Sequence, residues 1–236
     1  VTLAVAILMP AFNEKRLGVT LASVADAARG DLDVTVYLVD DGSDEPVGAG
    51  DLPECSDTFR IMLARHACNL GQGASLETAR RLALLDPPRD AYVTMDADGQ
   101  HRVDDAFALA RAVRDGADVA FGNRFLGDSN VPSVKRLVLC AARIFERALT
   151  GLRLSDAHNG LRGFSRRALE RIPIRQSRMA HATEIKQRVS RAPELVIVER
   201  PVSVRYTRQS IQKGQSSLGA LSIVHELATQ YLFGEP

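Results

Sequence analysis

The stretch YVTMDADGQH, residues 92–101, places two carboxylates, Asp96 and Asp98, one residue apart at the end of an apolar run. Side chains in a strand alternate between faces, so these two would point the same way where the strand runs out. Two like charges on one side repel unless a cation lies between them. Because Asp-Gly is also a common turn dipeptide, these residues alone leave two interpretations open, a metal site and a solvated turn.

Regular elements that would position these carboxylates alternate along the chain. Apolar and β-branched runs predict strands at residues 3–9, 34–40, 59–64, 91–96 and 117–122, with the first strand stopped by Pro10. Helical apolar patterns lie at residues 14–29, 73–86, 104–116 and 182–189. Strands that alternate with helices of this length predict an α/β fold in one domain, with a mainly parallel sheet flanked by helices.

Polar or glycine-bearing segments follow all five predicted strands: PAFNE, DDGSD, HACNLGQG, DADGQ and GNRF. Ligands of open parallel sheets bind outside the carboxyl ends of the strands. We therefore expect these five segments to share one rim. A solvated turn explains one acidic cluster, but it does not explain five convergent polar segments, so the pattern favours a binding site.

The composition excludes several function classes. Thirty basic and 29 acidic residues give a net charge of +1, which offers no global electrostatic basis for binding nucleic acid. Cys55, Cys68 and Cys140 show no Cys-x-x-Cys spacing, which favours a reducing, cytoplasmic location over a disulfide or zinc framework. No run approaches the roughly 18 apolar residues of a membrane span. We expect a protein that is soluble or peripheral at the inner face of the cell membrane.

A family resemblance covers most of the chain. The segments PAFNE, VDDGSD, NLGQGAS, DADGQH, GNRF, DAHNGLRGFSRRAL and KGQSS occur in order from residue 10 to residue 217. In these the chain resembles family-2 glycosyltransferases of the Rossmann-like GT-A fold, and in particular the polyprenyl-phosphate branch that includes dolichyl-phosphate mannose synthases. The resemblance implies an inverting enzyme that moves a sugar from a nucleotide-diphosphate sugar to polyprenyl phosphate.

The resemblance also implies a donor site. Carboxylates can accept hydrogen bonds from base N–H groups and ribose hydroxyls, and glycines ahead of a helix can leave free N–H groups for an anion or a sugar hydroxyl. The implied nucleotide-sugar residues are Pro10, Ala11, Asn13, Glu14, Asp40, Asp41, Asn69, Gly71, Gly73, Asp96 and Ala97. Oxygen ligands suit Mg²⁺ or Mn²⁺, and the implied metal ligands are Asp96, Asp98 and Gln100. His101 is either a further ligand or, as we prefer, a neighbour of these ligands or a surface residue.

Acceptor residues are implied by the later motifs. The acceptor phosphate would meet Arg124, Lys135, Arg136 and Arg162, and the catalytic set would be Asp156, Asp98 and Arg124. Asp156 is the candidate general base or acceptor-orienting group, and His158 is an alternative proton acceptor. His181 and Glu184 would share a helix face, either as a polar pair lining a cleft or with a role at the sugar.

Three other functions remain open. The enzyme could transfer the sugar to a soluble or polymeric glycan hydroxyl, for which a base such as Asp156 becomes essential. A non-catalytic nucleotide-binding subunit would retain the fold without turnover. A nucleotidyltransferase would share the sheet and the metal, but PAFNEKRLG is a poor match to the glycine- and basic-rich loop that it requires.

The C-terminal segment carries its own pattern. Apolar residues recur at three- and four-residue steps after residue 216, which predicts an amphipathic helix at 216–236 beyond a catalytic domain at 1–215. Its apolar stripe either packs on the sheet or docks on the bilayer or a small membrane-protein partner. Arg205, Arg208 and Lys213 precede it and would face anionic headgroups.

Overall fold

The structure is a computed structural model, and it describes residues 2–28, 30–127, 147, 151–152, 154–156, 159–178 and 180–203. The predicted helix at 216–236 lies outside the described residues. Within the part of the chain that is described, no helix is long and apolar enough to cross a membrane.

The described elements alternate as the sequence predicts, with two additional strands after the fifth. In chain order they are β1 (Leu3–Ala11), α1 (Leu17–Ala27), β2 (Leu32–Asp40), the 3₁₀ helix η1 (Ala49–Asp51), β3 (Phe59–Arg65), α2 (Gln72–Leu85), β4 (Ala91–Thr94), α3 (Val103–Arg114), β5 (Val119–Asn123), β6 (Arg162–Phe164), α5 (Arg166–Arg171), α6 (His181–Ser190) and β7 (Ile197–Pro201).

The sheet has seven strands in the order β3-β2-β1-β4-β6-β5-β7. The pairs β1–β2, β2–β3, β1–β4 and β5–β7 are parallel, whereas β6 runs antiparallel to both β4 and β5. The prediction of a mainly parallel sheet is therefore confirmed. Because β6 reverses direction between β4 and β5, the carboxyl end of β5 still lies on the same rim as those of β1 to β4.

Pro10 does not stop the first strand, and this prediction was wrong. β1 continues to Ala11, and Pro10 stands opposite Val39 of β2. The carbonyl of Leu8 accepts a hydrogen bond from Met95 N, so the backbone polar groups of Leu8 point toward β4. The backbone nitrogen of Pro10, two positions further along β1, points to the same side, where β4 has already ended at Thr94. Its missing N–H therefore breaks no bond of the ladder.

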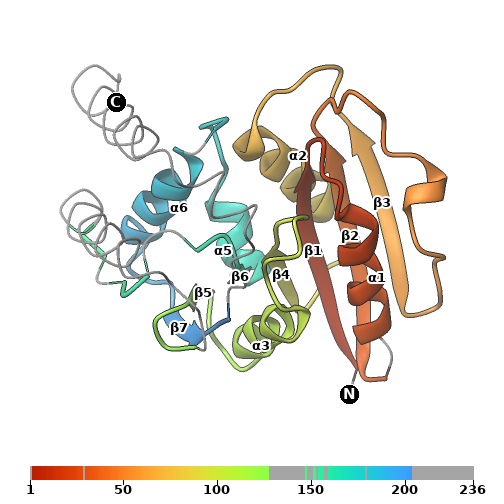
Figure 1. The fold of residues 1–236 in the computed structure, drawn as a ribbon. Coiled ribbons are helices and arrows are strands. Elements are labelled where there is room, and N and C mark those ends of the chain that lie inside the picture. The colour runs from red at the N-terminus through yellow and green to blue at the C-terminus, as the bar shows by residue number, and fades with distance from the viewer. Residues whose placement is uncertain are drawn as a thin grey trace.

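Helices cover both faces of the sheet (Figure 1). One apolar cluster joins β1 and β2 to α1 and α3, and the other joins the opposite sheet face to α2, α5 and α6. Strands β1 and β2 are buried almost throughout, which explains their continuous apolar runs. In α3 the charges match the helix dipole, with Asp104 in the first turn and Arg114 in the last. The fold thus fixes the strand ends that carry the polar motifs.

Candidate active site

Two neighbouring clefts open at the carboxyl ends of β1, β2 and β4. A cleft of about 520 Å³, here called the acidic cleft, is lined by Pro10, Ala11, Phe12, Glu14, Asp41, Asn69, Gly71, Gln72, Ser75, Asp96, Ala97, Asp98 and Arg178. A larger cleft of about 850 Å³ lies between α1 and residues 43–51 and shares Ala11 and Glu14 with the first. Of the predicted site residues, only Ala11, Glu14 and Asn13 line this larger cleft. The acidic cleft collects most of the predicted donor residues and is the candidate site.

Asp41 is held in place at the wall of the acidic cleft. One carboxylate oxygen accepts from His66 Nδ1 at 2.7 Å and from Leu70 N at 3.1 Å, and the other accepts from Gly71 N at 2.7 Å. His66 Nε2 contacts Thr78 Oγ1 at 2.9 Å. Nothing local in the sequence links residue 66 to residue 41, so this role of His66 is visible only in the tertiary structure. Asp41 therefore faces the cleft in one fixed orientation.

Asp40 behaves differently from its neighbour. Its side chain is buried and accepts hydrogen bonds from Ser43 N at 2.9 Å and Val47 N at 3.2 Å. Burial alone would raise the pKa of Asp40, but these hydrogen bonds, assisted by Arg65, hold it below its usual value. The structure thus places Asp40 inside the 43–47 turn, away from the lining of either cleft.

Asn13 connects the loop after β1 to the loop after β2. It is a non-glycine residue with a positive φ of 49°. Its backbone N–H donates to Ser43 Oγ at 2.9 Å, and its side-chain amide exchanges two hydrogen bonds of 3.0 Å with Asp44. Asparagine tolerates the left-handed region, so this residue shapes the rim by joining its two loops.

Asp96 is contacted on both carboxylate oxygens. Gln72 Nε2 donates to Oδ1 at 2.8 Å, and His101 Nε2 lies 3.3 Å from Oδ2. A Cβ at residue 160 would lie 2.7 Å from Oδ2, so a larger residue there would displace the Asp96 carboxylate. Partial burial would raise the pKa of Asp96, but His101 and the positive charge of Arg162 hold it below its usual value. Asp96 therefore remains an anion in the cleft.

Asp98 carries a charge that its surroundings compensate less well. Burial raises the pKa of Asp98, and the neighbouring charge of Asp96 raises it further. Gln100 donates its backbone N–H to Oδ1 at 2.9 Å and its side-chain amide to Oδ2. The amide nitrogen of Gln100, rather than its oxygen, therefore faces the carboxylate that was predicted to share a metal with it.

The pair of aspartates suits a divalent cation by its donor chemistry. Both side chains line the acidic cleft and both offer oxygen ligands, and burial together with the neighbouring charge of Asp96 raises the pKa of Asp98. Among the described residues, no three His, Cys, Asp or Glu side chains form a ready metal cluster. Asp96 and Asp98 are the two carboxylates from the DADGQ segment that the fold brings to this cleft.

The predicted glycines approach another part of the chain. Gly73 N and Ala74 N donate to Ser177 O at 2.7 and 3.4 Å, and a Cβ at Gly73 would collide with Gln176 O. The free N–H groups expected at the start of α2 are thus already engaged, which corrects that part of the prediction. The partner segment, residues 172–180, is here called the α5–α6 connection.

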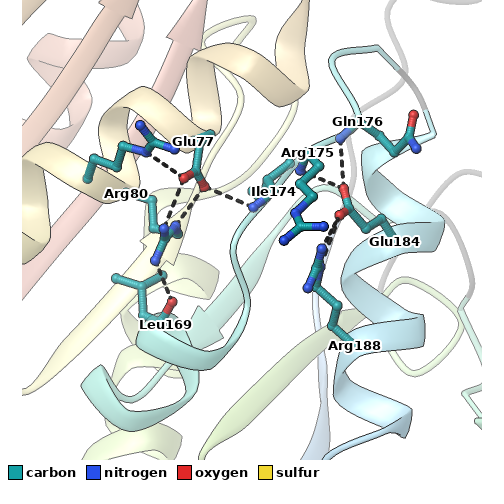
Figure 2. A network of polar contacts seen from close by, with 9 residues as sticks. Glu77, Arg80, Leu169, Ile174, Arg175, Gln176, Glu184 and Arg188 are labelled. Atoms are coloured by element: carbon teal, nitrogen blue, oxygen red, sulfur yellow. Dashed lines mark hydrogen bonds and ion pairs between the residues drawn. The ribbon is translucent and has the colours of Figure 1, made fainter. Parts of the chain in front are cut away.

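A buried carboxylate, Glu77, and a half-buried one, Glu184, hold the α5–α6 connection (Figure 2). Glu77 of α2 accepts from Ile174 N at 2.8 Å and from Arg80 and Arg81. Glu184 of α6 accepts from the backbone N–H groups of residues 175 and 176, each at 2.8 Å, and from Arg188. Glu184, which the sequence left between a cleft-lining and a sugar-binding role, is therefore engaged in holding this connection.

Arg124 and Asp156 form a buried ion pair across 32 residues. Arg124 donates to Asp156 Oδ2 through Nε at 2.6 Å and through its backbone N–H at 3.0 Å, and the two side chains are 8% and 0% exposed. Glu199 of β7 holds the same region by accepting from Asn123 Nδ2 and Ser155 N. The two residues that the resemblance assigns to the acceptor thus meet at the carboxyl end of β5.

The remaining predicted residues fall into two groups. Arg162 is buried in β6, and its charge acts on both Asp96 and His181. Burial, reinforced by Arg162, lowers the pKa of His181 to about 4, and its Nδ1 donates to Arg178 O at 2.6 Å. Lys135, Arg136 and His158 lie outside the described residues.

Comparisons with known proteins agree with this geometry. The model of the family described as Glycosyl transferase family 2 matches residues 6–173. The chain is 31% identical over 176 residues to the polyprenol monophosphomannose synthase of Mycolicibacterium smegmatis, covering 71% of this chain and 64% of that protein. It is 24% identical over 239 residues to the UDP-N-acetylglucosamine–dolichyl-phosphate N-acetylglucosaminyltransferase of Methanococcus voltae, covering 94% and 93% of the two.

A solved structure shares the fold. Glucosyl-3-phosphoglycerate synthase from Mycobacterium tuberculosis, in complex with Mn²⁺ and UDP-glucose, matches with a TM-score of 0.63 at 17% identity. The match covers 100% of this chain and 80% of the other. At this identity the likeness shows the GT-A fold and nothing finer.

Proposed function

This chain belongs to glycosyl transferase family 2 and is a glycosyltransferase of the GT-A fold, and we propose that it transfers a sugar from a nucleotide-diphosphate sugar to polyprenyl phosphate. The transfer would invert the anomeric carbon and depend on a divalent metal. The name of one relative contains polyprenol monophosphomannose, and the name of another contains dolichyl phosphate. Both names support this acceptor. The observation that carries the proposal is the acidic cleft, where Asp41, Asp96 and Asp98 meet.

The donor would lie in the acidic cleft. Glu14 and the oriented carboxylate of Asp41 would accept from base N–H groups and ribose hydroxyls. Pro10, Ala11 and Asn69 would shape the wall around them. Asp40 and Asn13 would act indirectly, since their side chains hold the loops that form the rim.

Asp96 and Asp98 would hold the metal, Mg²⁺ or Mn²⁺, beside the donor diphosphate. When bound, the cation neutralises the charge that develops on the leaving diphosphate. Gln72 and His101 would orient Asp96, and Gln100 would orient Asp98. These contacts fix the carboxylates before the donor arrives.

The Arg124–Asp156 pair favours a phosphate acceptor over a hydroxyl acceptor. Asp156 Oδ2 accepts two hydrogen bonds from Arg124, so the pair places a guanidinium, a group that binds phosphate oxygens, at this end of the site. A phosphate monoester has a second pKa of about 6 and is largely a dianion at neutral pH. It therefore needs positioning rather than deprotonation, and a polyprenyl phosphate would be presented at a membrane surface.

Transfer of radiolabel tests the proposal. The full chain is incubated with labelled GDP-mannose, UDP-glucose or UDP-N-acetylglucosamine, polyprenyl phosphate and Mn²⁺, and the products are extracted into organic solvent. We expect label from one donor in the organic phase, and none when EDTA replaces Mn²⁺. Label recovered only in a water-soluble glycan would contradict the lipid acceptor, and metal-independent transfer would contradict the role of Asp96 and Asp98.

A further inference from the structure

Arg178 is a cation on the wall of the acidic cleft to which the sequence patterns assign no role. Among the described residues that line this cleft it is the only lysine or arginine, whereas Glu14, Asp41, Asp96 and Asp98 supply carboxylates. A diphosphate that enters such a cleft meets repulsion unless cations face it. One metal ion between Asp96 and Asp98 would compensate part of this charge, and the buried Arg162 acts on Asp96 from behind. Arg178 is the cation among the described lining residues that would face the diphosphate itself.

The backbone of Arg178 is fixed on both sides. Before it, Ser177 O accepts from Gly73 N at 2.7 Å. Its own carbonyl accepts from His181 N at 3.1 Å and from His181 Nδ1 at 2.6 Å. Further back, Ile174 N is held by Glu77 of α2, as Figure 2 shows. The side chain itself is exposed, so a rigid backbone presents a guanidinium that is accessible from the cleft.

Gly71 provides the space for the Arg178 stem. Gly71 has a φ of +99°, and a Cβ there would collide with Ser177 O and lie 3.1 Å from Arg178 Cγ. The same glycine donates its N–H to Asp41. The loop that orients the Asp41 carboxylate is therefore also the surface against which the Arg178 stem lies, so both side chains are placed on one wall.

We infer that Arg178 binds the diphosphate of the nucleotide-sugar donor, an inference that rests on the proposed function. A guanidinium offers paired N–H donors that match phosphate oxygens, and such charge-assisted hydrogen bonds are about twice as strong as neutral ones. Arg178 faces the diphosphate from the α5–α6 connection, and Asp96 and Asp98 face it through the metal. The residue acts on the phosphates and leaves the nucleoside contacts unchanged.

The test compares ligands with and without the diphosphate. Affinities of the full chain for UDP, GDP, uridine and guanosine are measured with Mn²⁺ by calorimetry and ligand-observed NMR. We expect Arg178→Ala to weaken binding of the preferred nucleoside diphosphate by about 10- to 100-fold and to leave binding of the corresponding nucleoside unchanged. Arg178→Lys retains the charge without the paired donors and should give an intermediate loss.

Arg175→Ala is the matched control. Arg175 lies on the same connection, is exposed, and lines neither cleft, so its removal should leave every affinity unchanged. Equal diphosphate affinity in Arg178→Ala and Arg175→Ala overturns the inference, as does an equal loss of nucleoside affinity in Arg178→Ala. If the wild-type chain binds neither UDP nor GDP, the proposed function fails and the inference fails with it.

Discussion

Glu77 and Asp98 are both partly enclosed carboxylates, but their surroundings treat the negative charge in opposite ways. Burial alone would raise the pKa of Glu77, yet donors from Arg80, Ile174 N and Arg81 lower it below its usual value. Burial raises the pKa of Asp98, and Asp96 adds repulsion, whereas among the described residues Gln100 donates hydrogen bonds to it and His101 lowers its pKa. Glu77 is satisfied within the protein, and Asp98 is left with a charge that an added cation would stabilise.

This difference is the one expected between a structural carboxylate and one that binds a ligand. A buried charge that its neighbours fully compensate holds two elements together, and here it fastens α2 to the α5–α6 connection. A charge that is incompletely compensated at the edge of a cleft destabilises the protein slightly and attracts a ligand. Glu77 lies in α2, whose first turn also contacts the α5–α6 connection through Gly73 N and Ser177 O.

The largest effect is expected from Asp98→Asn. Removing the charge should lower turnover by at least about 100-fold, or about 2.7 kcal/mol in transition-state stabilisation, because a ligand of the proposed metal is lost. The free energy of unfolding should stay unchanged or rise, since one of two repelling carboxylates is gone. Initial rates and urea unfolding measure the two quantities. Manganese-dependent nucleotide binding at the wild-type level would contradict the assignment of Asp98 as a ligand.

Glu77→Gln should show the reverse pattern. We expect a loss of about 3 kcal/mol in the free energy of unfolding, because Arg80 would remain buried without its ionic partner. Urea unfolding measures this loss, and Glu54→Gln, at an exposed position, is the control. If Glu77→Gln is as stable as the control, then the Glu77 network does not hold the connection as the contacts suggest.

Gly73→Ala breaks the contact between the two regions. An added Cβ would collide with Gln176 O, so either α2 or the α5–α6 connection must shift. Overpacking of this kind costs about 1–3 kcal/mol, measured by thermal or urea unfolding. Gly50→Ala is the control, because a Cβ there meets no atom within 4 Å. Equal stability of the two variants would show that the connection adapts without cost.

The smallest effect is expected in the pH dependence of the free energy of unfolding. The pKa of Glu77 is lower in the folded state than in the unfolded chain, so its contribution to stability is complete above about pH 5. That contribution is lost as the pH falls through the folded-state value. Unfolding free energies between pH 3 and pH 7 should therefore decline less steeply in Glu77→Gln than in wild type or Glu54→Gln. An identical decline in all three proteins would assign the acid sensitivity to other groups, of which Asp40, with a lowered pKa, is the first.

Local sequence patterns determined most of the α/β framework. The five predicted strands all exist. The continuous apolar runs of β1 and β2 are required because these parallel strands are covered on both faces. Parallel topology places their carboxyl ends on one rim, which explains why Asp41, Asp96 and Asn69 line one cleft as predicted. These inferences need only the order of elements and the alternation of side chains along each strand.

Tertiary structure alone decided how each charged group is compensated. Asp40 and Asp41 are adjacent in the sequence, yet one is enclosed in a turn and the other faces the cleft. Arg124 meets Asp156, Glu77 meets Ile174, and Gly73 meets Ser177, each through contacts between segments far apart in the chain. Hydrogen-bond partners depend on which backbones approach one another within about 3 Å, and residue type and local period do not contain that information. For the same reason, a role for Arg178 emerges only when the α5–α6 connection is seen against the start of α2.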